Sequence, residues 1–398
     1  MTEPAMAPAE EWKDFSLSLV RNDPLFRLQR RLGLIPPDGP GVGRRAVFWT
    51  LVAWLPIAIW AVLNRRAMPG TVEEPLLQHF AVHTRLLIGI PAFHLAEALA
   101  HRALQRFLPY LVQSGIVPPD SIPAYQDVLR SVARFRDRTL PWIAILGVTV
   151  VLSAFNVTAE RMDELTWGMV GSGGQTLGFG GWWYVLVGRA IFLILLLSWV
   201  WRLFLFFGLF RGIAKLDLAL VPTHADRVAG LSVIEYMPTV FAPVIFAISS
   251  VLAATWGHQV LYHGVHVTEL RVQMIAFILL MLVLFLSPSL ALAPLLTRTK
   301  KKALLDYGAL IGAQGRLVRR RWIEGRDVED MAILSAPELG PVADINALYE
   351  PIRTMRPVPV GAHTLAAVAL PAVLPLIPVL AIEIPVKDLL LGLIKSMV

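Results

Sequence analysis

Cysteine is absent from this chain of 398 residues. That absence excludes a thiolate nucleophile, an iron–sulfur cluster, a cysteine zinc site and any disulfide bond. Charge is also scarce, because charged residues make up 16% of the chain, against about a quarter in soluble domains. Hydrophobic residues make up 56%. This composition excludes an ordinary soluble enzyme, a disordered protein and a small secreted module, and it predicts a polytopic membrane protein.

Long apolar stretches, by contrast, are plentiful. A spanning helix needs about 20 mostly apolar residues, and several stretches approach or exceed that length. They cover residues 46–63, 86–104, 140–157, 183–210, 238–260, 272–296 and, more weakly, 364–385. The last is rich in proline, so a re-entrant pair of half-helices is an alternative to a seventh span. We predict an all-α polytopic membrane bundle of six or seven transmembrane helices, with amphipathic helices on its surface.

The placement of lysine and arginine predicts the orientation of this bundle. With the N-terminus inside, the cytoplasmic segments are 1–45, 101–138, 211–235 and 298–362, and these hold most of the 36 basic residues. No signal peptide precedes the first span, so we expect a cytoplasmic N-terminus. The net charge of +7 is then explained by positive-inside topology and by anionic lipids at the cytoplasmic face, and no nucleic-acid partner is expected.

Four regions follow from these spans. Residues 1–45 form a cytoplasmic N-terminal amphipathic segment. Residues 46–297 form a transmembrane core of six helices, with a cytoplasmic helical insertion at 105–138. Residues 298–362 form a cytoplasmic helical segment that is first basic and then acidic. Residues 363–398 form the proline-rich seventh span or re-entrant segment and an interfacial C-terminus.

The second predicted span carries the most informative side chains. On a straight helix they lie within about 60° of one another and form a single stripe: His79, His83, His94, Glu97 and His101. An ionisable residue inside a membrane span is energetically costly, and it normally faces a cavity, a partner or a pathway. We therefore take His94, Glu97 and His101 as candidates for an ion or proton pathway. In the structural alternative Glu97 pairs with an intramembrane arginine, and the candidates are Arg85, Arg189 and Arg202. Pro91 offers a further alternative, because it interrupts the backbone hydrogen bonds and can rotate one half of the helix away from the other.

Histidines also gather on the side predicted to be external. Grouped imidazoles bind metal ions or sense pH, and the candidates for such a site are His79, His83, His258, His263 and His266. The spacing of the loop histidines matches no standard ligand motif. A metal or haem cofactor is therefore an alternative to exposed loop histidines, and none is predicted outright.

The inner loop after the fourth span contains the segment Pro222-Thr-His-Ala-Asp-Arg227. His224 and Asp226 can orient each other's side chains. One reading makes them a cytoplasmic gate or an acid–base pair at the membrane surface. The other makes Asp226 a cap at a turn that leads into a helix.

Three segments together resemble a family of uncharacterised bacterial inner-membrane proteins. They are Asp23-Pro-Leu-Phe-Arg-Leu-Gln-Arg-Arg-Leu-Gly-Leu-Ile-Pro36, Pro222-Thr-His-Ala-Asp-Arg227 and Met355-Arg-Pro-Val-Pro359. The resemblance covers essentially the whole chain, but Ala225 stands where the family pattern has proline. It implies a location in the bacterial inner membrane, and it implies no activity and no catalytic residue.

Three functions remain open from the sequence. The first is an ion channel or transporter with a titratable intramembrane site on the second span. The second is a membrane-embedded metal- or haem-binding redox protein, and the third is a non-catalytic scaffold or assembly partner. An enzyme is disfavoured, because no P-loop, His-Glu-x-x-His or Gly-x-Ser-x-Gly pattern occurs. A homo-oligomer is left open.

Overall fold

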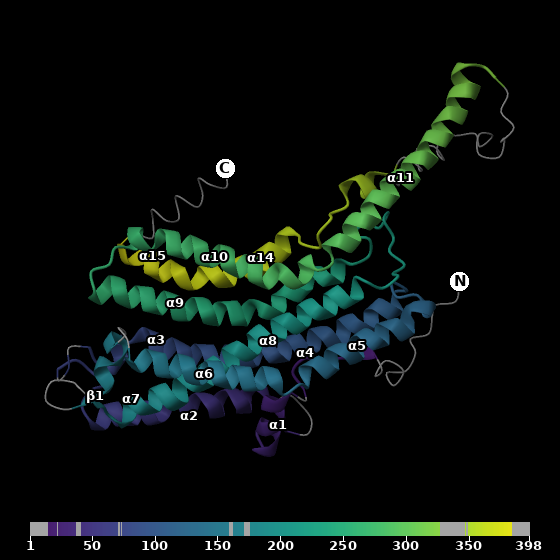
Figure 1. Cartoon of the computed structure of the whole chain (residues 1–398). Coiled ribbons are helices and arrows are strands. Elements are labelled where there is room, and N and C mark those ends of the chain that lie inside the picture. Colours follow the sequence, from purple (N-terminus) through teal and green to yellow (C-terminus); the bar gives the residue numbers. More distant parts are fainter. Residues whose placement is uncertain are drawn as a thin grey trace.

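The computed structural model describes residues 15–21, 23–36, 41–70, 72, 74–158, 162–170, 176–326, 347 and 349–383. Over these residues 78% of the chain is helical and almost none is strand, and the longest helices run side by side as a bundle (Figure 1). Six helical stretches are long and apolar enough to cross a membrane: Val42–Leu63, Pro119–Ala154, Phe179–Ile213, Ser232–Tyr262, Val267–Leu290 and Ala362–Glu383. The predicted all-α membrane bundle is therefore confirmed, and the chain is a multi-pass membrane protein.

Most of the helices begin and end close to the predicted limits. Their bounds are α2 (Val42–Leu63), α6 (Leu140–Thr158), α7 (Phe179–Trp183), η6 (Tyr184–Gly188), α8 (Arg189–Ile213), η7 (Ser232–Phe241), α9 (Ala242–Tyr262) and α10 (Val267–Leu290). The clearest difference is at the end of α10, which the sequence extends to residue 296. Pro294, near the start of the following helix, has no N–H for the backbone hydrogen bond that a continuous helix requires.

The second predicted span lies at the centre of the bundle. It comprises α3 (Phe80–His83), a π-helical turn η3 (Thr84–Gly89) and α4 (Ile90–Gln113), and α4 packs against α2, α8 and α9. This helix is not one of the six apolar stretches, because it carries several ionisable residues. A helix that is covered by other helices needs no lipid-compatible surface, which explains how so polar a segment occupies the middle of the bundle.

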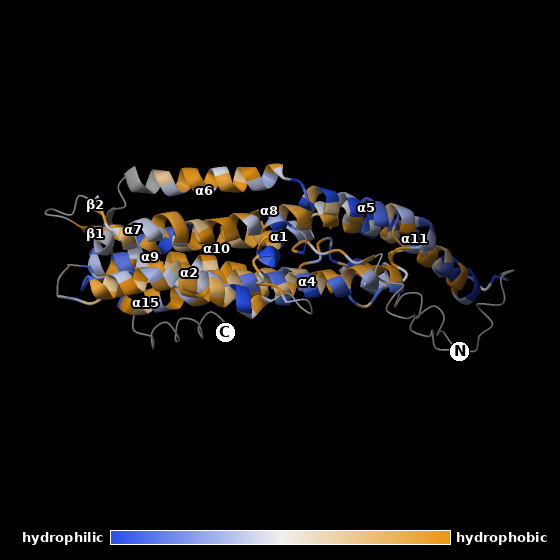
Figure 2. Cartoon of the chain, turned by 90° about the horizontal axis from the view of Figure 1, so that it is seen from below, coloured by the Kyte–Doolittle hydropathy of each residue, from blue (hydrophilic) through white to orange (hydrophobic). Residues whose placement is uncertain are grey.

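The outer helices have the opposite character. α6 packs on α8, α10 packs on α8 and the last helical stretch, and both turn large apolar side chains outward. Leu140, Ile143 and Val150 on α6 are exposed, as are Val272 and Val283 on α10. Figure 2 shows hydrophobic colouring along much of α6. Apolar exposure along whole helices suits contact with lipid tails rather than with water.

The last predicted span is one continuous helical stretch, so the re-entrant alternative is not what the structure shows. It comprises α14 (Ala362–Val373), a 3-10 turn η9 (Leu374–Leu376) and α15 (Ile377–Glu383), and it packs on α9 and α10. Pro375 lies in the 3-10 turn, where its missing N–H is tolerated. The hydroxyl of Ser249 on α9 donates to the carbonyl of Ala372 at 2.5 Å, which fastens this stretch to its neighbour. Pro385 lies outside the described residues.

The connecting segments gather at the two ends of the bundle. At one end lie η4 (Pro119–Ser121), α5 (Ile122–Arg136) and α11 (Ala293–Val318), which projects beyond the other helices and continues into η8 (Arg319–Ile323) (Figure 1). At the other end lie η2 (Leu76–Gln78), η5 (Met162–Gly168) and an antiparallel pair of short strands, β1 (Met169–Val170) and β2 (Thr176–Leu177). The basic helices α5 and α11 thus share one end of the bundle.

Candidate functional site

Four charged side chains from separate parts of the chain meet beside α4. Glu97 Oε2 lies 2.5 Å from Arg45 Nη1 of α2, and Glu97 Oε1 lies 2.8 Å from Arg202 Nη2 of α8. The same Arg202 nitrogen lies 2.9 Å from Asp23 Oδ2. All four side chains are at most 2% exposed. We call this group, Asp23, Arg45, Glu97 and Arg202, the arginine–carboxylate network.

The N-terminal segment supplies one carboxylate through a helix cap. Asp23 precedes α1 (Pro24–Arg31), and its Oδ1 accepts a hydrogen bond from the backbone N–H of Phe26 at 2.6 Å. This N-cap contact, with a proline at the first helical position, fixes the start of α1. The other carboxylate oxygen remains free to bind Arg202. Gln29 of α1 adds a second contact, because its Oε1 accepts from Arg45 Nη1 at 3.0 Å.

Aromatic rings cover the two guanidinium groups. The Arg45 guanidinium carbon lies 5.6 Å from the centre of the Phe26 ring, and that of Arg202 lies 5.2 Å from the Trp199 ring. A ring face attracts a cation and excludes water from it. Because two carboxylates face two guanidinium groups, the network is also balanced in charge, and that balance makes its burial tolerable.

Some N–H donors of these guanidinium groups have no acceptor among the described residues. Among the described residues no acceptor binds Arg45 Nε, Arg45 Nη2, Arg202 Nε or Arg202 Nη1. The same holds for Nε2 of His94 and Nε2 of Gln29. Unpaired donors in a buried site are costly, so a site with this many is suited to binding water or an anion.

The structure brings together two of the three pathway candidates. His94 Nδ1 lies 3.3 Å from Glu97 Oε2, and His94 is completely buried. His101 lies one turn further along α4, where its Nδ1 contacts the Ser18 hydroxyl at 3.1 Å instead of Glu97. Of the three arginines that the sequence offers as partners of Glu97, the one observed is Arg202, whereas Arg85 donates to the Tyr184 hydroxyl.

The single stripe of titratable residues predicted for a straight helix is wrong. The π-helical turn η3 lies between His83 and His94 and changes the rotational register of the helix. His79 precedes α3 and is not helical. Pro91, just after the π-helical turn, explains its position, because proline cannot donate to the preceding turn. Glu97 contacts Arg45, which lies one turn from the start of α2. Glu97 is therefore level with that end of α2 rather than with its middle.

A second buried group lies at the opposite end of the bundle. His258 Nε2 lies 3.4 Å and His79 Nε2 3.8 Å from Glu74 Oε2, while His263 Nε2 lies 3.5 Å from Glu74 Oε1. The rings of His79 and His258 stack with their centres 5.1 Å apart. We call Glu74, His79, His258 and His263 the histidine–glutamate cluster. Its ligand types suit a metal ion, and the stacked rings leave no room between them for a haem.

The other two predicted metal ligands lie outside this cluster. His83 Nδ1 accepts from the Trp54 indole at 3.0 Å, and its Nε2 lies 3.0 Å from the Leu76 carbonyl. His266 is exposed and contacts Glu383 at 3.1 Å.

The inner-loop pair is held by backbone contacts. Asp226 Oδ1 accepts from the N–H groups of Val228 and Gly230 at 2.9 and 3.2 Å, and Oδ2 accepts from Ser232 at 3.1 Å. His224 Nδ1 lies 3.0 Å from the same carboxylate. Burial opposes ionisation, but these donors together hold the pKa of Asp226 below its usual value. The contacts favour the structural role of Asp226, as the group that fixes the turn.

Two of the segments that carry the family resemblance dock on each other. The Arg356 backbone N–H donates to the Arg227 carbonyl at 2.7 Å, and the Arg356 guanidinium contacts Glu235 at 2.5 Å. Lys300 Nζ donates to the Met355 carbonyl at 2.6 Å. The third segment supplies Asp23 and Gln29 to the arginine–carboxylate network. These segments therefore fasten the helices at the basic end of the bundle.

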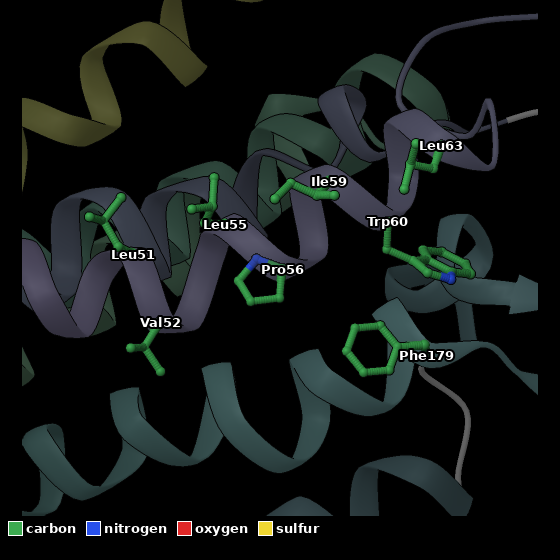
Figure 3. Close-up of a pocket in the computed structure, with 8 residues that line it drawn as sticks. All are labelled: Leu51, Val52, Leu55, Pro56, Ile59, Trp60, Leu63 and Phe179. Atoms are coloured by element: carbon green, nitrogen blue, oxygen red, sulfur yellow. The ribbon is translucent and has the colours of Figure 1, made fainter.

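An open groove on the bundle has a different chemistry. It holds about 590 Å³ between α2 and α7, and its lining is apolar: Leu51, Val52, Leu55, Pro56, Ile59, Trp60, Leu63 and Phe179 (Figure 3). Figure 3 shows Trp60 and Phe179 together at one end of it. The Trp60 ring packs so closely on Gly178 and Gly180 that a Cβ at either position would collide with it. The groove suits an acyl chain and offers no group for chemistry.

Three members of the two groups were not predicted from the sequence: Asp23, Arg45 and Glu74. The neighbouring Gln29, which contacts Arg45, was not predicted either. Asp23 had a usable signal, since Asp before Pro is a typical helix start.

No protein-family model, curated protein or solved structure matches this chain.

Proposed function

We propose that this protein transports ions across a bacterial inner membrane, and that the arginine–carboxylate network with His94 controls the transport. The end that holds α5 and α11 would face the cytoplasm, where their basic side chains meet anionic lipids. The observation that carries the proposal is the burial of four charged groups and a histidine within a membrane bundle. Ionisable groups in such positions typically mark ion pathways or proton relays.

Protonation provides a way to open the network. Burial raises the pKa of the Asp23 carboxyl above its usual value, even though Arg202 opposes that rise. When Asp23 takes up a proton, Arg202 is held by Glu97 alone, and the contact between α1 and α8 weakens. Release of α1 from the bundle is the gating movement that we propose.

The spare arginine donors give the transported species a place to bind. An anion or a file of water molecules would satisfy the free N–H groups of Arg45 and Arg202. Proton uptake adds positive charge to a neutral network, and anion binding removes it again. Coupled uptake of a proton and an anion is therefore the transport mode that this charge balance favours.

Flux in proteoliposomes tests the proposal. Wild-type protein is reconstituted with an enclosed pH dye, in chloride and in sulfate. An inward pH gradient drives the uptake of protons with anions, while equal potassium on both sides and an ionophore hold the voltage at zero. Glu97→Gln and His94→Ala should each lower the proton flux at least about tenfold, which corresponds to about 1.4 kcal/mol in the limiting barrier. His363→Ala is the matched control, because His363 is exposed at the start of α14 and lies outside the network.

Two outcomes would remove the proposal. One is a wild-type flux no larger than that of empty liposomes in either salt. The other is full flux in both Glu97→Gln and His94→Ala, with both variants eluting as monodisperse protein. Loss of flux in His363→Ala as well would show that the assay reports damage to the fold rather than to the site.

A further inference from the structure

The histidine–glutamate cluster takes no part in the proposed transport step. It brings together side chains from the loop after α2, from the start of α3 and from the end of α9. One ligand atom each of Glu74, His79 and His258 lies within 4.8 Å of the other two. We propose that this cluster is a binding site for a divalent transition-metal ion, and that Zn²⁺ is the ion that fits it best.

The distances match those between ligands of one metal ion. Zinc binds imidazole nitrogen at about 2.0–2.1 Å and carboxylate oxygen at about 2.0–2.2 Å, so two ligands of a tetrahedral ion stand about 3.4 Å apart. His258 Nε2 and Glu74 Oε2 are 3.4 Å apart, and His79 Nε2 is 3.8 Å from the same oxygen. Two of the separations are thus within about 0.4 Å of the tetrahedral value, and the third is below 4.8 Å. To bind the ion, His79 Nε2 would exchange its 3.1 Å contact with the Thr166 hydroxyl for the metal.

The hydrogen bonds of His258 prepare it as a ligand. Its Nδ1 lies 3.0 Å from the Gln78 carbonyl, which can only accept, so Nδ1 carries the proton. Nε2 then presents a lone pair, and among the described residues it has no hydrogen-bond partner. Metal-binding histidines typically donate their second ring N–H to a carbonyl or carboxylate in this way.

Glu74 presents the same feature from the other side. Its Oε2 is buried and, among the described residues, accepts no hydrogen bond, although it faces His258 Nε2. Two acceptors that face each other at 3.4 Å repel unless a cation lies between them. That cation is either a metal ion or a second proton on His258, and a metal titration distinguishes the two.

His263 supplies the fourth ligand and the route of entry. It follows the last residue of α9, and its Nε2 lies 3.5 Å from Glu74 Oε1. Its side chain is 35% exposed, whereas that of His79 is 3% exposed. The site is thus closed on the bundle side and open on the solvent side. Three imidazoles and one carboxylate suit zinc and its neighbours in the first transition series rather than calcium or magnesium.

Metal titration of the purified full-length protein in detergent tests the site. Protein treated with chelator is titrated with Zn²⁺ and with Co²⁺, whose visible absorption reports tetrahedral nitrogen and oxygen ligands. We expect one ion per chain. Glu74→Gln and His263→Ala should each weaken binding by at least about 10- to 100-fold, since even the loss of an outer-shell partner has an effect of that size.

His266→Ala is the matched control. His266 lies on the same surface, but it is exposed and contacts Glu383 instead of the cluster. The His266→Ala variant should bind Zn²⁺ as tightly as the wild type does. Elution volume and unfolding temperature in chelator show whether each variant is folded, so a loss of binding in Glu74→Gln can be assigned to the ligand.

The proposal fails if the folded wild type binds neither ion, because the cluster then holds only a proton. It also fails if Glu74→Gln binds Zn²⁺ as tightly as the wild type. Equal weakening in His266→Ala and His263→Ala would overturn it too, since the ion would then be bound by surface histidines in general.

Discussion

The two ends of this bundle bury polar groups in different ways. At one end the arginine–carboxylate network sets two guanidinium groups against two carboxylates, and every charge has an opposite charge within 2.9 Å. At the other end, the histidine–glutamate cluster surrounds one carboxylate with three imidazoles at 3.4 to 3.8 Å. The first group has donors to spare. The second has acceptors that face each other.

The difference indicates what each end needs in order to be complete. Charge balance makes the network a stable joint between α1, α2, α4 and α8 that a proton can disturb. The histidine–glutamate cluster reaches the same balance only when a cation is added. The fully buried network therefore joins helices at one end, and the partly exposed cluster is a binding site at the other.

The largest expected effect is on the free energy of unfolding at the network. Arg202→Met leaves Asp23 and Glu97 buried without their shared partner, and it should destabilise the protein by about 3–5 kcal/mol. Unfolding in detergent, followed by circular dichroism against denaturant, measures the change. Arg271→Met on α10 is the control, because Arg271 is exposed, and an exposed substitution usually changes stability by no more than about 0.5 kcal/mol.

If Arg202→Met were as stable as Arg271→Met, the network would not join the helices. Both carboxylates would then be protonated or hydrated in the protein, and the comparison between the two ends would lose its basis.

The next effect is at the histidine–glutamate cluster, where stability should depend on metal. A ligand that binds only the folded state stabilises it by about 2.7 kcal/mol at 100 times its dissociation constant. The free energy of unfolding of the wild type should rise by this amount when free Zn²⁺ is present at 100 times its dissociation constant. Glu74→Gln should show the wild-type midpoint in chelator and no shift with Zn²⁺. A zinc shift of equal size in Arg202→Met and wild type would show that the two ends act independently.

Asp226, a partly buried carboxylate outside both groups, gives a smaller effect and a pH dependence. Asp226 is satisfied by backbone N–H groups rather than by arginine or metal. In Asp226→Asn the amide NH₂ would face the Ser232 N–H, so the variant should lose about 1–2 kcal/mol. Because its pKa is lowered in the folded protein, Asp226 contributes full stability above the ordinary value of 3.8 and loses it as the pH falls through the lower value.

The pH dependence is the way to check this assignment. Unfolding midpoints of wild type and Asp226→Asn, measured from pH 7 down to pH 3, should converge as the pH falls. A constant difference between the two proteins across that range would mean that the Asp226 charge does not stabilise the turn.

Hydropathy was sufficient to predict where the helices lie in the sequence. It did not predict how each helix is rotated or which helices it contacts. The outer helices α2, α6 and α10 face lipid, so their composition alone identifies them. The central helix was predicted from its apolar residues as well, but its rotation was not. The π-helical turn η3 lies just before Pro91, and no periodicity in the sequence indicates that turn.

The site residues divide in the same way. His94 and Glu97 were found because ionisable residues stand out in an apolar span. Arg202 was one of three arginines that the sequence could not rank, since the choice depends on which helix packs beside α4. Arg45 and Glu74 lie at the ends of apolar stretches, where charged residues are ordinary, and only the folded chain brings them to their partners.

The most direct test of the central claim keeps the network balanced while it removes the proposed site. The double variant Arg45→Gln/Glu97→Gln takes away one charge of each sign and leaves the Arg202–Asp23 pair. Its proton flux in proteoliposomes should fall to the level of empty liposomes, although its unfolding midpoint exceeds that of Glu97→Gln alone. A folded double variant with wild-type flux would contradict the account, because ions would then cross the membrane without Glu97.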